Sequence, residues 1–234
     1  MVYICTDIIQ RALFPAKCLL CGAPSTEGMD ICCHCLDDLP HNHNRCQICS
    51  LPLSTNHAQP ICGKCLKRAP RFDHCYAPFS YAYPLSGLIS DFKFSGKFYS
   101  GRLLAKLLTD FLERDEIELP ELIIPVPLHP TRLRERGFNQ ALELAKPIGR
   151  HFNIPIDIQS CSRIKATATQ STLDKKIRSK NMRGAFKIAQ GFSCKHLAIV
   201  DDVVTTGNTV NELAKIIKAS GVQRVDVWAL ARTP

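Results

Sequence analysis

The sequence lacks any long apolar run, and none of its hydrophobic stretches approaches the roughly 18–20 residues that a membrane-spanning helix requires. Its first residues, MVYICTD, place an acid where a secretory signal would be apolar, so we expect a cytoplasmic protein. Low-complexity segments are also missing. Hydrophobic residues make up 45% of the 234 residues and charged residues 22%, a composition that can bury a core and excludes wholesale disorder.

Acidic residues are scarce relative to basic ones, with 21 Asp and Glu against 30 Lys and Arg and a formal net charge of +9. Residues 1–76 contain seven basic and six acidic side chains, so the excess of positive charge belongs to the rest of the chain. A basic surface attracts phosphates, whether on nucleotides or on nucleic acids, and composition alone does not decide between them.

Cysteine is abundant and unevenly placed: eleven of the 13 cysteines fall within the first 75 residues. Eight of them form four Cys-x-x-Cys pairs. A two-residue gap lets both thiolates of a tight turn bind one ion, and two such turns complete a tetrahedral four-sulfur site. We therefore predict two structural Zn²⁺ sites, with the ligands Cys18, Cys21, Cys32, Cys35, Cys46, Cys49, Cys62 and Cys65. How the four turns pair between the two metals stays open.

Two other interpretations of these cysteines are possible. A redox Cys-x-x-Cys motif occurs once, at the start of a helix in a strand–helix–strand unit, which this segment lacks. Coordination by Cys33 in place of Cys32 would break the two-residue gap. Closed four-sulfur sites leave no open coordination position, so the metals are expected to stabilise a segment with a poor core of its own and not to catalyse.

Beyond residue 75 the pattern changes to alternating strands and helices. Short buried strands are predicted at 77–83, 122–126, 197–200 and 225–231, and helices at 103–112, 139–151 and 208–220. This alternation is typical of a parallel sheet flanked by helices. We expect two domains, a small Cys-rich zinc-ribbon segment over 1–75 and an α/β domain over 76–234.

The segment 196–209 combines a buried strand, two carboxylates and a hydroxyl-rich turn that leads into a helix. In open α/β sheets, ligands bind at the carboxyl ends of strands, and a turn at a helix N-terminus suits a phosphate. Asp201 and Asp202 would repel a phosphate but suit the hydroxyls of a ribose, with Mg²⁺ alongside. The candidate phosphate- and ribose-binding residues of the turn are Thr205, Thr206, Gly207, Asn208 and Thr209.

This segment resembles the phosphoribosyl-diphosphate signature of type I phosphoribosyltransferases. Further blocks resemble the ComF family, which places a zinc ribbon before that fold: residues 92–97 (FKFSGK), 125–129 (PVPLH), 136–140 (RGFNQ), 169–171 (TQS) and 183–186 (RGAF). The similarity covers residues 15–234 in the family's order. It implies a type I phosphoribosyltransferase-like fold behind a double zinc ribbon.

The resemblance also implies a function and partners. Family members serve natural transformation, and their expected partners are incoming single-stranded DNA, the ComFA helicase and the recombination mediator DprA. The expected ligand is phosphoribosyl diphosphate with Mg²⁺. Asp201 and Asp202 would then be the catalytic residues, because their negative field favours positive charge on the ribose as diphosphate leaves.

Four arginines are candidates for the diphosphate or for a mobile loop: Arg132, Arg136, Arg178 and Arg183. Residues 161–187 are basic, with Asp174 as the single acid, and fit either a lid over the active site or a track for the DNA backbone. Support for stacked bases is thin, because only Phe186 and Phe192 lie nearby.

Three functions therefore remain in competition. The first is a competence factor that binds phosphoribosyl diphosphate and assists the handling of single-stranded DNA. The second is an active phosphoribosyltransferase with an unidentified base or amine acceptor, and the third is a non-catalytic adaptor. No residue in the sequence identifies an acceptor.

Overall fold

The fold was analysed in a computed structural model, which describes residues 16–25, 28–54, 60–165 and 183–234. Its centre is a five-stranded parallel sheet in the order β1-β7-β6-β3, with β2 also paired to β7. A separate antiparallel pair joins β4 to β5. The strands are β1 (His74–Tyr76), β2 (Phe79–Ser80), β3 (Leu122–Pro125), β4 (Cys161–Arg163), β5 (Phe186–Ile188), β6 (His196–Val204) and β7 (Arg224–Arg232).

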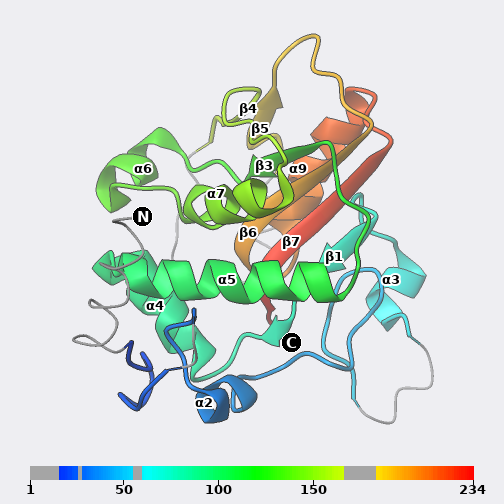
Figure 1. The fold of residues 1–234 in the computed structure, drawn as a ribbon. Helices are drawn as coiled ribbons and strands as arrows, with labels where there is room; N and C mark the ends of the chain where they lie inside the picture. The colour runs from blue at the N-terminus through cyan, green and yellow to red at the C-terminus, as the bar shows by residue number, and fades with distance from the viewer. Residues whose placement is uncertain (1–15, 26–27, 55–59, 166–182) are drawn as a thin grey trace.

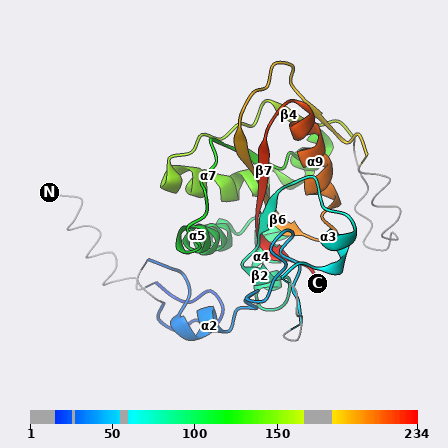
Figure 2. The ribbon, with the colours of Figure 1, turned by 90° about the vertical axis from the view of Figure 1, so that its right-hand side faces the viewer.

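Helices cover both faces of the sheet. Helices α5 and α7 lie on one face and α9 lies on the other, as the edge-on view in Figure 2 shows. No helix in the described ranges is long and apolar enough to cross a membrane. The helices are α2 (Cys33–Asp37), α3 (Gly63–Lys67), α4 (Leu85–Ser95), α5 (Phe98–Arg114), α6 (Pro130–Arg136), α7 (Gln140–Phe152) and α9 (Asn208–Ala219).

The apolar periodicity places α5, α7 and α9 correctly, whereas the other four described helices were not predicted. In α5 the predicted stripe is buried at every position, and the helix runs beyond it at both ends. Helix α7 continues through Pro147. The predicted strand at 77–83 is wrong in its bounds, because the structure has β1 before it and only Phe79 and Ser80 within it. Pro78 lies between the two strands and has no N–H to donate to a sheet.

The first zinc ribbon is the segment that carries Cys18, Cys21, Cys32 and Cys35, and the second is the segment that carries Cys46, Cys49, Cys62 and Cys65. The two ribbons contact different faces of the sheet. Residues of the first ribbon, among them Cys18, Ile31 and Leu39, share one hydrophobic core with α4 and α5. The cysteines of the second ribbon share another core with α9, through residues such as Val210 and Leu213. Neither ribbon is an appendage, because each contributes buried side chains to the core on one side of the sheet. Figure 1 shows α2 of the first ribbon below α5, and α3 of the second ribbon to the right of β1.

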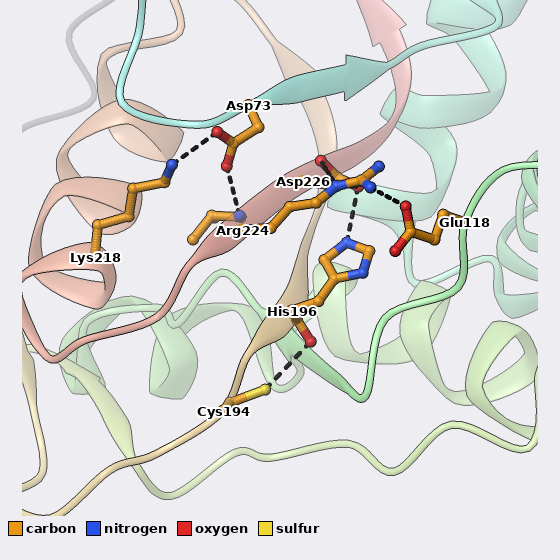
Figure 3. Close-up of polar contacts among 8 residues, drawn as sticks. Asp73, Glu118, Cys194, His196, Lys218, Arg224 and Asp226 are labelled. Carbon is orange, nitrogen blue, oxygen red and sulfur yellow. Dashed lines mark hydrogen bonds and ion pairs between the residues drawn. The ribbon is translucent and has the colours of Figure 1, made fainter.

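A polar network joins the amino ends of β6 and β7, at the edge of the sheet opposite Asp201 (Figure 3). His196 Nε2 lies 2.9 Å from Asp226 Oδ2, and Arg224 Nη2 lies 3.0 Å from the same carboxylate oxygen. Asp73 accepts hydrogen bonds from Lys218 Nζ at 2.7 Å and from the Val225 N–H at 2.8 Å. These contacts tie β1 and α9 to the sheet and leave the carboxyl edge for a ligand.

Candidate functional site

The two aspartates of the predicted site lie near the carboxyl end of β6. The strand is longer than predicted, because Asp201, Val203 and Val204 still pair with β7. Side chains alternate along a strand, and Val200 belongs to the core under α5 and α7 while Ile199 belongs to the core under α9. Asp202 therefore lies on the α5 and α7 face and Asp201 on the α9 face, so the carboxylates flank the strand.

Their electrostatic environments differ. Asp202 is buried, and its Oδ2 forms an ion pair with Lys93 Nζ of α4 at 2.8 Å. Burial, followed by the negative charge of Asp202, raises the pKa of Asp201 from 3.8 to about 7. Opposing charges on Lys93 and Arg163 only partly offset these effects. The charge of Asp202 is thus neutralised by Lys93, whereas the charge of Asp201 is unfavourable unless a ligand supplies a cation or a hydrogen-bond donor.

The hydroxyl-rich turn follows directly and leads into α9. Gly207 has φ 78°, in the left-handed region, and precedes the first residue of the helix. The Asn208 N–H donates to Thr206 Oγ1 at 3.4 Å, while the Thr205 and Thr206 side chains are exposed. Gly207, Asn208 and Thr209 are partly exposed. Free hydroxyls and helix N–H groups are the donors that a phosphate requires.

Arg232, near the end of β7, donates hydrogen bonds to the backbone at the start of this turn. Its Nη1 donates to the carbonyls of Val204 and Thr233, each at 3.0 Å, and to the carbonyl of Thr205. Its Nε donates to the carbonyl of Cys49 at 3.1 Å. The side chain is buried, so a single guanidinium connects the second zinc ribbon to the hydroxyl-rich turn, the candidate phosphate turn.

We expect Arg232→Lys to lower the free energy of unfolding by about 2–4 kcal/mol, because an ammonium group cannot reach all four carbonyls and leaves buried acceptors unpaired. Thermal denaturation measures the loss, and Arg150→Lys on the exposed face of α7 serves as the matched control. Equal melting temperatures for the two variants would contradict the role assigned to Arg232.

The loop after β3 lies beside the aspartates. The Val126 N–H donates to the Val200 carbonyl at 2.9 Å, which continues the β3–β6 pairing into the loop. Asn139 holds the loop from the other side: its Nδ2 donates to the Val126 carbonyl at 3.1 Å while its Oδ1 caps α7. The RGFNQ block thus has a structural explanation at Asn139.

The candidate arginines divide into three groups. Arg132 and Arg136 line a cavity of about 210 Å³ together with Lys93, and the guanidinium of Arg136 lies 5.4 Å from the centre of the Phe94 ring. Burial and the charge of Arg132 lower the pKa of Arg136, against the opposing effect of Asp202. Arg183 lies elsewhere, in a cavity against α9. Arg178 is outside the described residues, as is most of the basic segment 161–187.

Two cations near the aspartates were not identified as site residues from the sequence. Lys93 belongs to the FKFSGK block, which carried the family resemblance without a role. Arg163 was counted only within the basic segment, yet its charge acts on Asp201. Lys93 and Asp202 are far apart in the sequence, so no local pattern predicts their ion pair. The two lysines of the FKFSGK block were the one indication that this segment lies near an anion.

The eight predicted cysteines form two groups of four, and within each group all Sγ atoms lie within 4.8 Å of one another. The turns pair in chain order: Cys18 and Cys21 with Cys32 and Cys35, then Cys46 and Cys49 with Cys62 and Cys65. A tetrahedral site with Zn–S near ~2.3 Å requires sulfur–sulfur separations of about 3.8 Å. The Cys21–Cys32 and Cys49–Cys62 separations are both 3.7 Å, so the groups fit structural Zn²⁺. Cys33 is exposed and outside both groups.

Comparison with known proteins agrees with these features. A family model described as a double zinc ribbon domain matches residues 9–66. The chain is 37% identical over 224 residues to "DNA utilization protein YhgH" of Shigella flexneri, covering 94% of this chain and 98% of that one. It is 42% identical over 178 residues to "Competence protein F" of Haemophilus influenzae, covering 73% and 78%. "Competence protein ComFC" of Streptococcus pneumoniae is 28% identical over 160 residues, covering 67% of each chain.

Among solved structures, a purine phosphoribosyltransferase from Pyrococcus horikoshii aligns with a TM-score of 0.34 and 19% identity, covering 59% of this chain and 76% of that one. A hypoxanthine phosphoribosyltransferase from Staphylococcus aureus aligns with a TM-score of 0.34 and 17% identity, covering 57% and 65%. In this chain itself, a parallel sheet with helices on both faces follows an N-terminal double zinc ribbon with two four-cysteine groups, which confirms the expected fold class. On its similarity to the DNA utilization protein over 94% of its length and to Competence protein F over 73%, the chain belongs to the ComF family.

Proposed function

We propose that this protein binds phosphoribosyl diphosphate with Mg²⁺ at the carboxyl edge of its sheet and assists the handling of incoming single-stranded DNA in natural transformation. The observation that carries the proposal is the continuity of two parts. The Asp201–Asp202 pair near the end of β6 runs without interruption into a turn with free hydroxyls at the start of α9. A pentose phosphate has the two chemistries, hydroxyls and a phosphate, that these parts accept.

In this proposal each group has a distinct part. Asp201 and Asp202 accept hydrogen bonds from the ribose hydroxyls, and the turn from Thr205 to Thr209 donates to the 5′-phosphate. Arg132 and Arg136 on α6, with the loop after β3, receive the diphosphate. Bound Mg²⁺ would neutralise the diphosphate and position it as a leaving group.

The link to DNA comes from the family. Relatives carry the names competence protein and DNA utilization protein, and the net charge of +9 suits a partner with a phosphate backbone. We propose that the protein is cytoplasmic and that the ComFA helicase and DprA are its partners in transformation. We also propose that the zinc-ribbon segment and the α/β sheet form the two expected domains.

Catalysis is a second candidate function. The Asp pair beside a leaving-group site is the arrangement that pentosyl transfer requires, because negative charge under the ribose favours an oxocarbenium ion. Diphosphate release in the presence of purines, pyrimidines or ammonia tests it. No release above hydrolysis across that panel would leave the protein as a binding factor, and a chain that also binds no phosphoribosyl diphosphate would be an adaptor.

The binding proposal is tested by the shift in melting temperature that phosphoribosyl diphosphate produces with and without Mg²⁺. A ligand at about 100 times its dissociation constant adds about 2.7 kcal/mol, which corresponds to a rise of about 5–10 °C for a chain of this size. Ribose 5-phosphate and inorganic diphosphate serve as controls, because each occupies only part of the site. No shift with the full ligand, or the same shift after chelation of Mg²⁺, contradicts the proposal.

A further inference from the structure

A second cavity lies on the outer side of the phosphate turn, between the second zinc ribbon and α9. Its volume is about 560 Å³, within the range of ligand-binding pockets. One wall is the end of α3 and the loop that follows it, and the other is the first two turns of α9. Thr206, Gly207 and Asn208 line it together with these elements, so the cavity shares the turn with the ribose-phosphate site.

This cavity is strongly basic. Five exposed cations line it: Lys64, Arg68, Arg71, Arg183 and Lys215. Within the described part of the chain none of the five forms an ion pair, whereas Arg45, Lys93, Lys97 and Lys218 elsewhere each pair with an aspartate. Of the described residues in the lining, one is acidic: Glu212, which is buried and accepts a hydrogen bond from the Gly184 N–H at 2.8 Å. Five unpaired cations in one concave site attract phosphates.

The walls of the cavity are fixed to α9 by specific contacts. The Arg71 N–H donates to Asn211 Oδ1 at 2.6 Å and holds the loop of the second ribbon. The Gly184 N–H donates to Glu212, and Lys165 Nζ donates to the Arg183 carbonyl at 2.8 Å. Two segments that are distant in sequence, at residues 71 and 184, are therefore held against α9, and Lys165 joins a third segment to Arg183. These contacts fix the backbone that carries Arg71 and Arg183, which lowers the cost of ordering the site around a ligand.

We propose that this cavity binds the phosphodiester backbone of a single-stranded nucleic acid. The inference rests on the proposed function, to which it adds the surface where the strand lies. Phosphoribosyl diphosphate does not account for the five cations, because its 5′-phosphate is a monoester that ends at the turn. They lie on α3, on the loop after it, at residue 183 and on α9, a distribution that suits a chain of phosphates. A membrane of anionic lipids is the other polyanion that five cations would attract, but its charge lies on a flat surface, which fits a concave site poorly.

The lining also sets the kind of recognition. Among the residues that the structure describes, Phe72 is the only aromatic residue that lines the cavity, and it is buried. Without an exposed ring on which a base can stack, contacts are to phosphates and depend little on sequence. Each phosphate contact to a single strand adds about 0.7 to the slope of log affinity against log salt, so all five cations give a slope of at most about 3.5.

The test uses the full chain with both zinc ions bound and a fluorescein-labelled oligothymidylate, with affinity measured by fluorescence anisotropy at several salt concentrations. In Arg68→Gln/Arg71→Gln we expect at least a roughly tenfold loss of affinity at low salt and a slope smaller by about 1.4. Arg102→Gln/Arg150→Gln, on α5 and α7 across the sheet, removes the same charge and is expected to bind as wild type does.

Each outcome decides the inference. It is supported if only the cavity variant loses affinity while keeping its melting-temperature shift with phosphoribosyl diphosphate, which also shows that the variant is folded. It is overturned if the two variants lose affinity equally, if wild type binds no oligonucleotide, if a duplex of the same length binds more tightly, or if the cavity residues affect only binding to phosphatidylglycerol vesicles. Loss of the shift with phosphoribosyl diphosphate in wild type would instead reject the proposed ligand and leave the oligonucleotide result standing.

Discussion

Asp201→Asn is expected to abolish the binding of phosphoribosyl diphosphate and, at the same time, to stabilise the unliganded protein above pH 7. The amide keeps an oxygen that can accept the Asp202 N–H, a bond of 2.9 Å in the structure, but it carries no charge. The substitution therefore replaces charge-assisted hydrogen bonds to the ribose hydroxyls by weaker neutral ones, and it also removes the cost of holding a negative charge beside Asp202. Loss of the ligand-induced shift together with a higher basal melting temperature is the expected pair of results.

The pH dependence follows from the direction of the shift. Asp201 has a pKa of about 7 in the folded protein against 3.8 for the free side chain. Between these values the folded state binds more protons than the unfolded chain, so stability from this group falls as pH rises and becomes constant above about pH 7. The advantage of Asn is thus absent near pH 4 and largest above pH 7, where we expect about 2–4 kcal/mol.

Asp202→Asn is the matched control. It is the same chemical change at the next residue, but Asp202 is buried against Lys93 at 2.8 Å, and losing its charge leaves that ammonium without its partner. We expect it to lose the ligand as well and to be less stable than wild type. Thermal melts of both variants from pH 4 to 9 measure the effect, and two variants that move in the same direction above pH 7 would contradict the distinction between the carboxylates.

Cys49→Ser is expected to lose one of two zinc ions and to unfold the second ribbon. All four cysteines of this group are buried and share a core with α9. Structural zinc binds such sites with about 10–16 kcal/mol, comparable to the whole stability of a domain. The Cys49 carbonyl also accepts from Arg232, so the phosphate turn loses a support and affinity for phosphoribosyl diphosphate falls with the metal.

Cys33→Ser provides the control for this change. Cys33 is exposed, outside both groups of four, and adjacent to the ligand Cys32. We expect it to keep two zinc ions per chain and a melting temperature within about 1–2 °C of wild type. Zinc content by mass spectrometry and thermal melts test both variants. Because Cys49→Ser can fail to accumulate, chelator titration of wild type gives an independent measurement; a protein that retains its fold and ligand affinity after losing both metals would contradict the role given to zinc.

Local patterns were sufficient for three strands of the sheet (β3, β6 and β7), for the helices α5, α7 and α9, and for the metal ligands, whereas α2, α3, α4, α6, β1, β4 and β5 were not predicted. The buried stripe of α5, the strands around Ile123 and Ile199 and the Cys-x-x-Cys turns depend on neighbours a few residues apart, which the sequence displays directly. The pairing of the cysteine turns was left open, because similar spacings permit either arrangement. The short β2 was overestimated because the alternation at 77–83 gave no weight to Pro78.

The supports of the site could not be predicted in the same way. Lys93 reaches Asp202 from α4, and Arg232 reaches the carbonyls of Cys49 and Thr205 from the end of β7. These contacts join segments that are far apart in the chain, so no periodicity records them. Arg232 also ends a strand whose central residues are mostly apolar, and it lies outside the motifs that the sequence displays. Nothing in the local pattern therefore indicates that it supports the site.

The position of β7 has a consequence for synthesis on the ribosome. This strand lies between β6 and the early strands β1 and β2, and His74 pairs with Asp226, about 150 residues later. At about 5–20 residues per second, the ribbons emerge on the order of ten seconds before the strand that β1 needs as its partner. We therefore expect the thiols of the ribbons to bind metal before the sheet closes, which would protect them from oxidation during that interval.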